Sequence, residues 1–94
     1  MESMFENSKF NGDISNWDVS NVKTMCKMFL NSIFNSNIAN WDVFTCRNFD
    51  EMFMNDSEFY QDLSSWKIKK GSKTGMTFWG TKTVNNSKFM PQFV

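Results

Sequence analysis

Apolar residues recur along this chain in a pattern that repeats every 24 to 25 residues. Within one period, Trp17 and Val19 alternate with the polar residues Asn16 and Asp18, as the residues of a half-buried strand do. From Val22 onward the spacing of apolar residues becomes three, three and one, which is typical of the buried stripe of a short helix. The pattern therefore predicts units made of a strand, a turn, a short helix and a loop.

The repeated phrase is clearest around the tryptophans. Its first two copies are FNGDISNWDV at residues 10–19 and FNSNIANWDV at residues 34–43. A third, more divergent copy is FYQDLSSWKI at residues 59–68. A fixed period of this length indicates stacked units, because no single unit can bury its apolar face alone. The sequence thus predicts an α/β repeat fold, a short leucine-rich-repeat-like solenoid of strand–turn–short helix units.

Stacking of equivalent residues leads to specific expectations. Rings in neighbouring units should contact one another. The expected columns are Trp17, Trp41 and Trp66, and Phe5, Phe29, Phe53 and Phe78. The expected helix caps are Asp18 or Ser20 in the first unit and Asp42 or Thr45 in the second.

The units divide the chain into two parts. Residues 1–78 hold about three tandem repeats, at approximately 4–27, 28–52 and 53–77, and residues 79–94 diverge from the phrase. The divergent segment is expected either to fold back as a C-terminal cap or to form a flexible tail, since solenoids need their ends covered. Because the chain begins within a repeat, we expect either a piece of a longer array or another covering for that end.

The phrase FN-DIS-WDVSNV--M--MF resembles the repeat of BspA-type bacterial surface proteins, which is also known as a mycoplasma repeat of unknown function. Its order Ile14-x-x-Trp17-x-Val19 matches the strand core of a leucine-rich repeat, with Trp in place of the second Leu. The resemblance covers about residues 4–78, and the third copy departs from it at Lys67, Gly71 and Thr74. It implies a leucine-rich-repeat-like fold and a role as an adhesin or displayed interaction protein.

Charge is distributed unevenly along the chain. Residues 1–66 carry ten acids and four bases, a net charge of −6, whereas residues 67–94 carry six lysines and no acid, a net charge of +6. Such a split favours oriented association over non-specific binding of nucleic acid. No apolar stretch approaches the roughly 20 residues that a membrane span needs, so no membrane span is expected.

The residue types argue against catalysis and against a bound cofactor. There is no His, which removes the commonest general base and zinc ligand. Cys26 and Cys46 occupy different repeat positions and read as two partly buried small residues, with a disulfide between them left open. The aspartates Asp13, Asp18, Asp42 and Asp62 are too dispersed for a calcium loop and suit turns and caps. The sequence therefore predicts no metal, no cofactor and no enzymatic activity.

The outward row of the strands is the candidate partner-binding face. Its residues are Asn16, Asp18, Asn40, Asp42, Phe44, Lys67 and Lys69. Phe44 stands where the phrase has Ser, and two interpretations stay open: an exposed contact, or a ring that packs into the next layer. The lysines either contact a partner or keep the end strand soluble and unpaired.

These observations predict a non-enzymatic module for protein interaction or surface adhesion, which binds a protein partner or a host or matrix component through this face. The alternative is a structural protein that stacks head to tail, as a filament or virion component. The sequence leaves the compartment open: cell surface or extracellular within a longer array, otherwise cytoplasmic or virion-associated. No nucleic-acid partner is expected.

Overall fold

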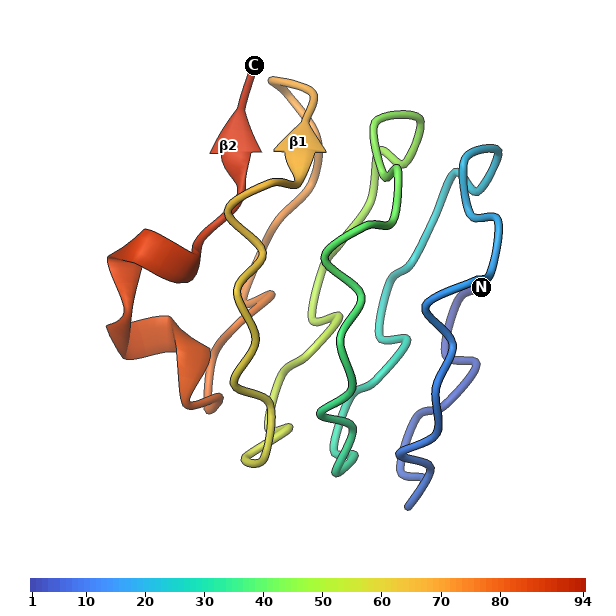
Figure 1. Cartoon of the computed structure of the whole chain (residues 1–94), viewed down its shortest axis with the longest axis vertical. Coiled ribbons are helices and arrows are strands. Elements are labelled where there is room, and N and C mark those ends of the chain that lie inside the picture. The colour runs from blue at the N-terminus through green and yellow to red at the C-terminus, as the bar shows by residue number, and fades with distance from the viewer.

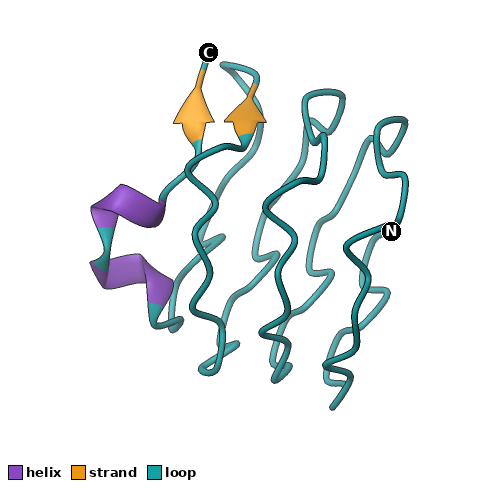
Figure 2. Cartoon of the chain, in the orientation of Figure 1, coloured by secondary structure: helices purple, strands orange, loops and turns teal.

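Regular secondary structure is sparse and confined to the C-terminal third of the chain. A computed structural model describes residues 1–94; its elements are the strands β1 (Lys67–Ile68) and β2 (Gln92–Phe93) and the 3₁₀ turns η1 (Thr83–Asn85) and η2 (Ser87–Phe89). The two strands pair in parallel, with Lys67 opposite Gln92 and Ile68 opposite Phe93. The rest of the chain consists of turns and extended loops (Figure 2).

The predicted α/β, leucine-rich-repeat-like solenoid of strand–turn–short helix units is wrong. The structure has no α-helix, and its two strands are only two residues long. The molecule is a compact body with extents of 30 × 26 × 22 Å and a radius of gyration of 11.7 Å. That radius is close to the value of about 12 Å expected for a globular domain of this length.

The backbone conformation explains why the predicted helices do not form. An α-helix needs φ near −63° at every residue, but Lys27 has φ 58° and Glu51 has φ 56°. The N–H of Met28 donates to the carbonyl of Met25, three residues back, while the N–H of Lys27 donates to the carbonyl of Asp50. A positive φ at the third of four residues is a feature of type II turns. The three-residue spacing of apolar positions thus marks tight turns and not a helical stripe.

Four turn segments of this kind, residues 1–8, 25–32, 49–56 and 74–81, are joined by backbone hydrogen bonds. At their centres, the N–H of Phe5 donates to Met28 (2.8 Å), that of Phe29 to Met52 (2.8 Å) and that of Phe53 to Thr77 (2.9 Å). Figure 1 shows the successive stretches of chain lying side by side. Each turn segment is therefore stabilised by its neighbours as well as by its own turns.

The core is built on aromatic columns. Seventeen buried apolar residues form one cluster. The predicted phenylalanine column is confirmed, because Phe5–Phe29, Phe29–Phe53 and Phe53–Phe78 stack at centroid distances of 5.5, 5.4 and 5.6 Å. A second column joins Phe10, Phe34 and Phe59 at 6.3 and 6.4 Å.

The predicted tryptophan column is only partly formed. Trp41 and Trp66 are buried and stack at 6.5 Å. Trp17 is 38% exposed and packs instead against Phe5, with a centroid distance of 6.0 Å. The stack therefore lacks its first predicted ring.

The C-terminal residues lie against the segment that contains β1. Phe89 accepts a hydrogen bond from the N–H of Leu63, and Val94 exchanges hydrogen bonds with Ile68 and Lys70. The boundaries of the predicted repeats, and the division of residues 79–94 into cap or tail, stay predictions.

Candidate functional site

All seven residues of the predicted binding face are exposed, but few of them are in contact. They are Asn16, Asp18, Asn40, Asp42, Phe44, Lys67 and Lys69. The structure brings three together, because Phe44 contacts both Asp42 and Lys69. No hydrogen bond or ion pair joins the other four to one another or to this group. The seven residues are therefore exposed as expected, only Asp42, Phe44 and Lys69 are in contact, and the binding role of the face stays a prediction.

The Phe44 cluster, defined as Asp42, Phe44 and Lys69, is held by two local contacts. The Oδ1 atom of Asp42 accepts a hydrogen bond of 3.2 Å from the backbone N–H of Phe44, which fixes the turn. The Nζ atom of Lys69 lies 4.8 Å from the centroid of the Phe44 ring, within the range of a cation–π contact. Phe44 is 41% exposed. The ring is therefore exposed in part and in contact with Lys69 of the following stretch, and its role as a partner contact stays a prediction.

The other predicted aspartates make turns. Asp13, Asp18 and Asp62 each accept a hydrogen bond from the backbone N–H of the serine two residues later, at 2.9, 3.0 and 2.9 Å. Hydrogen bonds from these serines lower the pKa of each of the three carboxyls. The turn role is confirmed, whereas the predicted caps at Asp18 or Ser20 and at Asp42 or Thr45 are wrong because there is no α-helix to cap.

Both cysteines are free thiols. Cys46 is buried and Cys26 is half-buried, as predicted, and no disulfide joins them. Burial raises the pKa of both thiols, which keeps them protonated and weakly nucleophilic. No three His, Cys, Asp or Glu side chains are grouped closely enough to hold a metal ion.

A polar hollow of about 620 Å³ lies among the first two copies of the phrase. It is lined by Asp13, Ser15, Ser36, Asn37, Ala39 and Asn40. Asn40 is the one residue of the predicted face that it includes. The Ser15 hydroxyl donates a hydrogen bond of 2.7 Å to the Oδ1 atom of Asp13, so these two polar groups of the wall already have a partner within the molecule.

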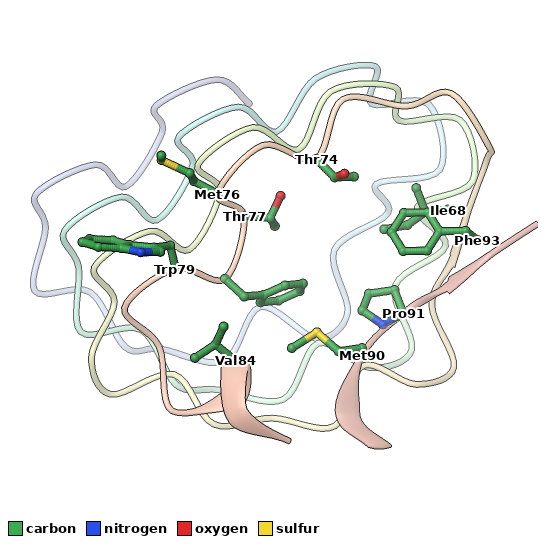
Figure 3. Close-up of a pocket in the computed structure, with 10 residues that line it drawn as sticks. Ile68, Thr74, Met76, Thr77, Trp79, Val84, Met90, Pro91 and Phe93 are labelled. Carbon is green, nitrogen blue, oxygen red and sulfur yellow. The ribbon is translucent and has the colours of Figure 1, made fainter. Parts of the chain in front are cut away.

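An apolar hollow of about 360 Å³ opens at the C-terminal side (Figure 3). Its walls are Ile68, Thr74, Met76, Thr77, Phe78, Trp79, Val84, Met90, Pro91 and Phe93. Met76 and Trp79 are 60% and 56% exposed. Sequence reasoning missed this surface, although a signal was present. Met76 has φ 54°, and the equivalent turn positions with positive φ are held by Ser3, Lys27 and Glu51, so an apolar residue stands at a position that is polar or charged in the other three segments.

Comparison with known families identifies the chain at a coarse level. The family described as "Mycoplasma protein of unknown function, DUF285" matches residues 1–90. The chain belongs to this DUF285 family. The match agrees with the mycoplasma-type part of the resemblance, and it shows neither a BspA-type protein nor a leucine-rich repeat. No curated protein matches the chain, and no solved structure does.

This DUF285 chain also contains a buried carboxyl that the sequence did not single out. Asp56 is fully buried, and its Oδ2 atom accepts a hydrogen bond of 3.1 Å from the Ser32 hydroxyl. Its Oδ1 atom has no partner. Burial raises the pKa of Asp56 from 3.8 to about 7, because desolvation disfavours the charged form. Asp56 lies inside the protein, away from any hollow, so it bears on stability.

No helix has the length and apolar character that a bilayer crossing requires.

Proposed function

We propose that this DUF285 chain is a non-enzymatic interaction module that binds a protein partner, or a component of a host surface or matrix. The resemblance of its phrase to BspA-type surface proteins supports this class of function. The single observation that carries the proposal is the exposed Phe44 ring with the Lys69 ammonium above it. Aromatic side chains are enriched at protein interfaces and often supply a large part of the binding energy.

The geometry of the Phe44 cluster suits binding. The hydrogen bond from the backbone N–H of Phe44 to Asp42 holds the turn, so the backbone that carries the ring loses little conformational freedom when a partner covers it. Lys69 comes from a segment 25 positions further along the chain, so two neighbouring stretches contribute to one surface. An acidic or aromatic group on the partner would complement this pair.

The experiment measures binding to immobilised collagen, fibronectin and laminin and to cultured animal cells. The variants are Phe44→Ala and Lys69→Ala, and the matched control is Ile33→Ala, since Ile33 is apolar and 43% exposed. Loss of an interface hot spot of about 2 kcal/mol lowers affinity roughly 30-fold. We expect that loss for Phe44→Ala, a smaller loss for Lys69→Ala and none for Ile33→Ala. Equal binding by all three variants would sink the assigned face.

A second candidate function is head-to-tail assembly of this chain. The observation that favours it is the split of charge, −6 over residues 1–66 and +6 over residues 67–94. Opposite charges on two parts of one molecule attract copies of it in a fixed orientation. Sedimentation at low and high salt tests this candidate, because screening weakens contacts between exposed charges.

A further inference from the structure

The backbone hydrogen bonds between turn segments follow one rule. At the first junction, three N–H groups donate to three carbonyls of the next segment, at 2.9, 2.8 and 2.8 Å. The pairs are Ser3 to Cys26, Phe5 to Met28 and Asn7 to Leu30. The donors are alternate residues, and the acceptors are also alternate residues. Each segment therefore offers donors toward one neighbour and acceptors toward the other.

The same rule holds at the next two junctions. The pairs are Lys27 to Asp50, Phe29 to Met52 and Asn31 to Met54, and then Glu51 to Gly75, Phe53 to Thr77 and Asn55 to Trp79. All six distances lie between 2.8 and 2.9 Å. Within the second and third segments, each accepting carbonyl belongs to the residue directly before one of the same segment's donating N–H groups. The direction of donation is thus constant through the molecule.

The two outermost turn segments leave complementary groups unpaired. The backbone N–H groups of Met76, Phe78 and Gly80 make no hydrogen bond, and the carbonyls of Glu2, Met4 and Glu6 accept none. The flanking donor residues share one conformation, because φ is positive at Ser3 and Asn7 and at Met76 and Gly80. One end therefore presents three N–H donors on alternate residues, and the other end presents three carbonyl acceptors on alternate residues. This is the same spacing that pairs donors with acceptors at the three internal junctions.

Side chains at the two ends are also complementary. Phe78 ends the phenylalanine column beside the apolar hollow, and Phe5 begins the column at the opposite end. Met4 and Met76 are both exposed next to these rings. Residues 1–24 carry four acids and two lysines, a net charge of −2, whereas residues 73–94 carry three lysines and no acid, a net charge of +3. A contact between the two ends would thus join unlike charges and cover apolar surface on both sides.

We propose that the apolar hollow and the edge formed by Met76, Phe78 and Gly80 are the docking site for the first turn segment of a second copy of this chain. The N–H groups of these three residues donate to the carbonyls of Glu2, Met4 and Glu6 of that copy, and Phe78 stacks on its Phe5. This inference rests on the second candidate function and specifies its partner and register. The contact is head to tail, so it does not close a dimer and continues as long as free ends remain.

The test blocks one end at a time. Met4→Arg obstructs the acceptor end and Met76→Arg obstructs the donor end; both residues are exposed, so the fold tolerates the change. Ile33→Arg is the matched control on an exposed apolar residue outside both ends. Sedimentation velocity is measured at micromolar to millimolar protein, for each variant alone and for the two blocked variants mixed.

We expect wild type and Ile33→Arg to form a concentration-dependent series of oligomers. Each end-blocked variant should remain monomeric alone, and their mixture should give a species of twice the monomer mass, because one free donor end meets one free acceptor end. Amide exchange in the wild type should slow at Met76, Phe78 and Gly80 as concentration rises.

Two results would overturn the inference. One is a wild type that stays monomeric across the whole concentration range. The other is a Met4→Arg variant that still dimerises alone, which would indicate a symmetric contact between two apolar hollows. A Phe44→Ala variant separates this proposal from partner binding, because it should assemble as the wild type does even where binding to matrix proteins is lost.

Discussion

The central and C-terminal turn segments have similar backbones but very different surroundings. In the segment 49–56, Phe53 is fully buried between Phe29 and Phe78, and hydrogen bonds run to neighbours on both sides. In the segment 74–81, Met76 and Trp79 are exposed and three backbone N–H groups have no acceptor. The difference lies in whether a second neighbour covers the segment. The side chains of a turn segment in this protein thus become buried by packing against the segments on both sides, and not by contacts within the segment itself.

The largest expected effect tests this contrast in burial. Phe53→Ala removes a ring that stacks on Phe29, Phe59 and Phe78, and truncation of a buried Phe typically costs about 3 to 5 kcal/mol. Trp79→Ala removes an exposed ring, so its cost should stay within about 1 kcal/mol. Urea denaturation followed by tryptophan fluorescence measures both. Similar losses in the two variants would mean that the C-terminal segment is as fully packed as the centre.

The next effect concerns the buried carboxyl of the central segment. The pKa of Asp56 is raised from 3.8 to about 7 in the folded protein, so between these pH values the folded state binds more protons than the unfolded state. The free energy of unfolding should therefore fall as pH rises from about 4 to about 7. The expected loss is at most on the order of 4 kcal/mol, because each unit of pKa difference between the folded and unfolded states corresponds to about 1.4 kcal/mol.

Asp56→Asn provides the control for that prediction. The amide is neutral at every pH, so its unfolding free energy should change less between pH 4 and pH 7 than that of the wild type. The measurement is a series of urea denaturation curves across this range. An Asn variant with the same slope as the wild type would assign the pH dependence to other groups.

A smaller effect distinguishes the turns of the two segments. Gly80 has φ 84°, and an added Cβ would lie 3.2 Å from the backbone N and Cα of Asn55. Gly80→Ala should therefore cost about 1 to 2 kcal/mol through backbone strain. Asn55 already carries a side chain at φ 60°, so Asn55→Ala should cost less. Thermal melting of the two variants checks the order, and the reverse order would contradict the account of Gly80.

The smallest effect is expected on the exposed side of the first copy of the phrase. Asp18→Ala removes the acceptor for the N–H and hydroxyl of Ser20. These hydrogen bonds hold the pKa of Asp18 below its usual value of 3.8, so the stabilisation is present above that pH and is lost as pH falls through the lowered pKa. Melting temperatures of Asp18→Ala and wild type should therefore differ slightly at pH 7 and converge at strongly acidic pH. A constant difference would exclude the charged hydrogen bond as its origin.

Much of the core and part of the candidate site could be predicted from the sequence. The period of the phrase placed Phe5, Phe29, Phe53 and Phe78 in one column, and the odd residue Phe44 was singled out with two interpretations left open. The aspartates were correctly assigned to turns because Asp side chains accept hydrogen bonds from the backbone two residues on. The apolar hollow was missed because its walls come from residues 68–93, and no local pattern states that Pro91 and Phe78 line the same space.

By itself, then, the sequence determined most of the buried apolar positions, because apolar spacing records burial whether the backbone is helical or turned; the exposed Trp17 and the buried Asp56 are exceptions. Tertiary structure decided the backbone conformation. A spacing of three residues suits a helix or a succession of tight turns, and the choice depends on where each N–H finds its acceptor. For Lys27 that acceptor is the carbonyl of Asp50 in the neighbouring segment. Only the folded chain brings these two residues together, so the segment forms turns and not a helix. The tertiary structure likewise buries Asp56 and thereby raises its pKa, at a position that the apolar pattern did not mark.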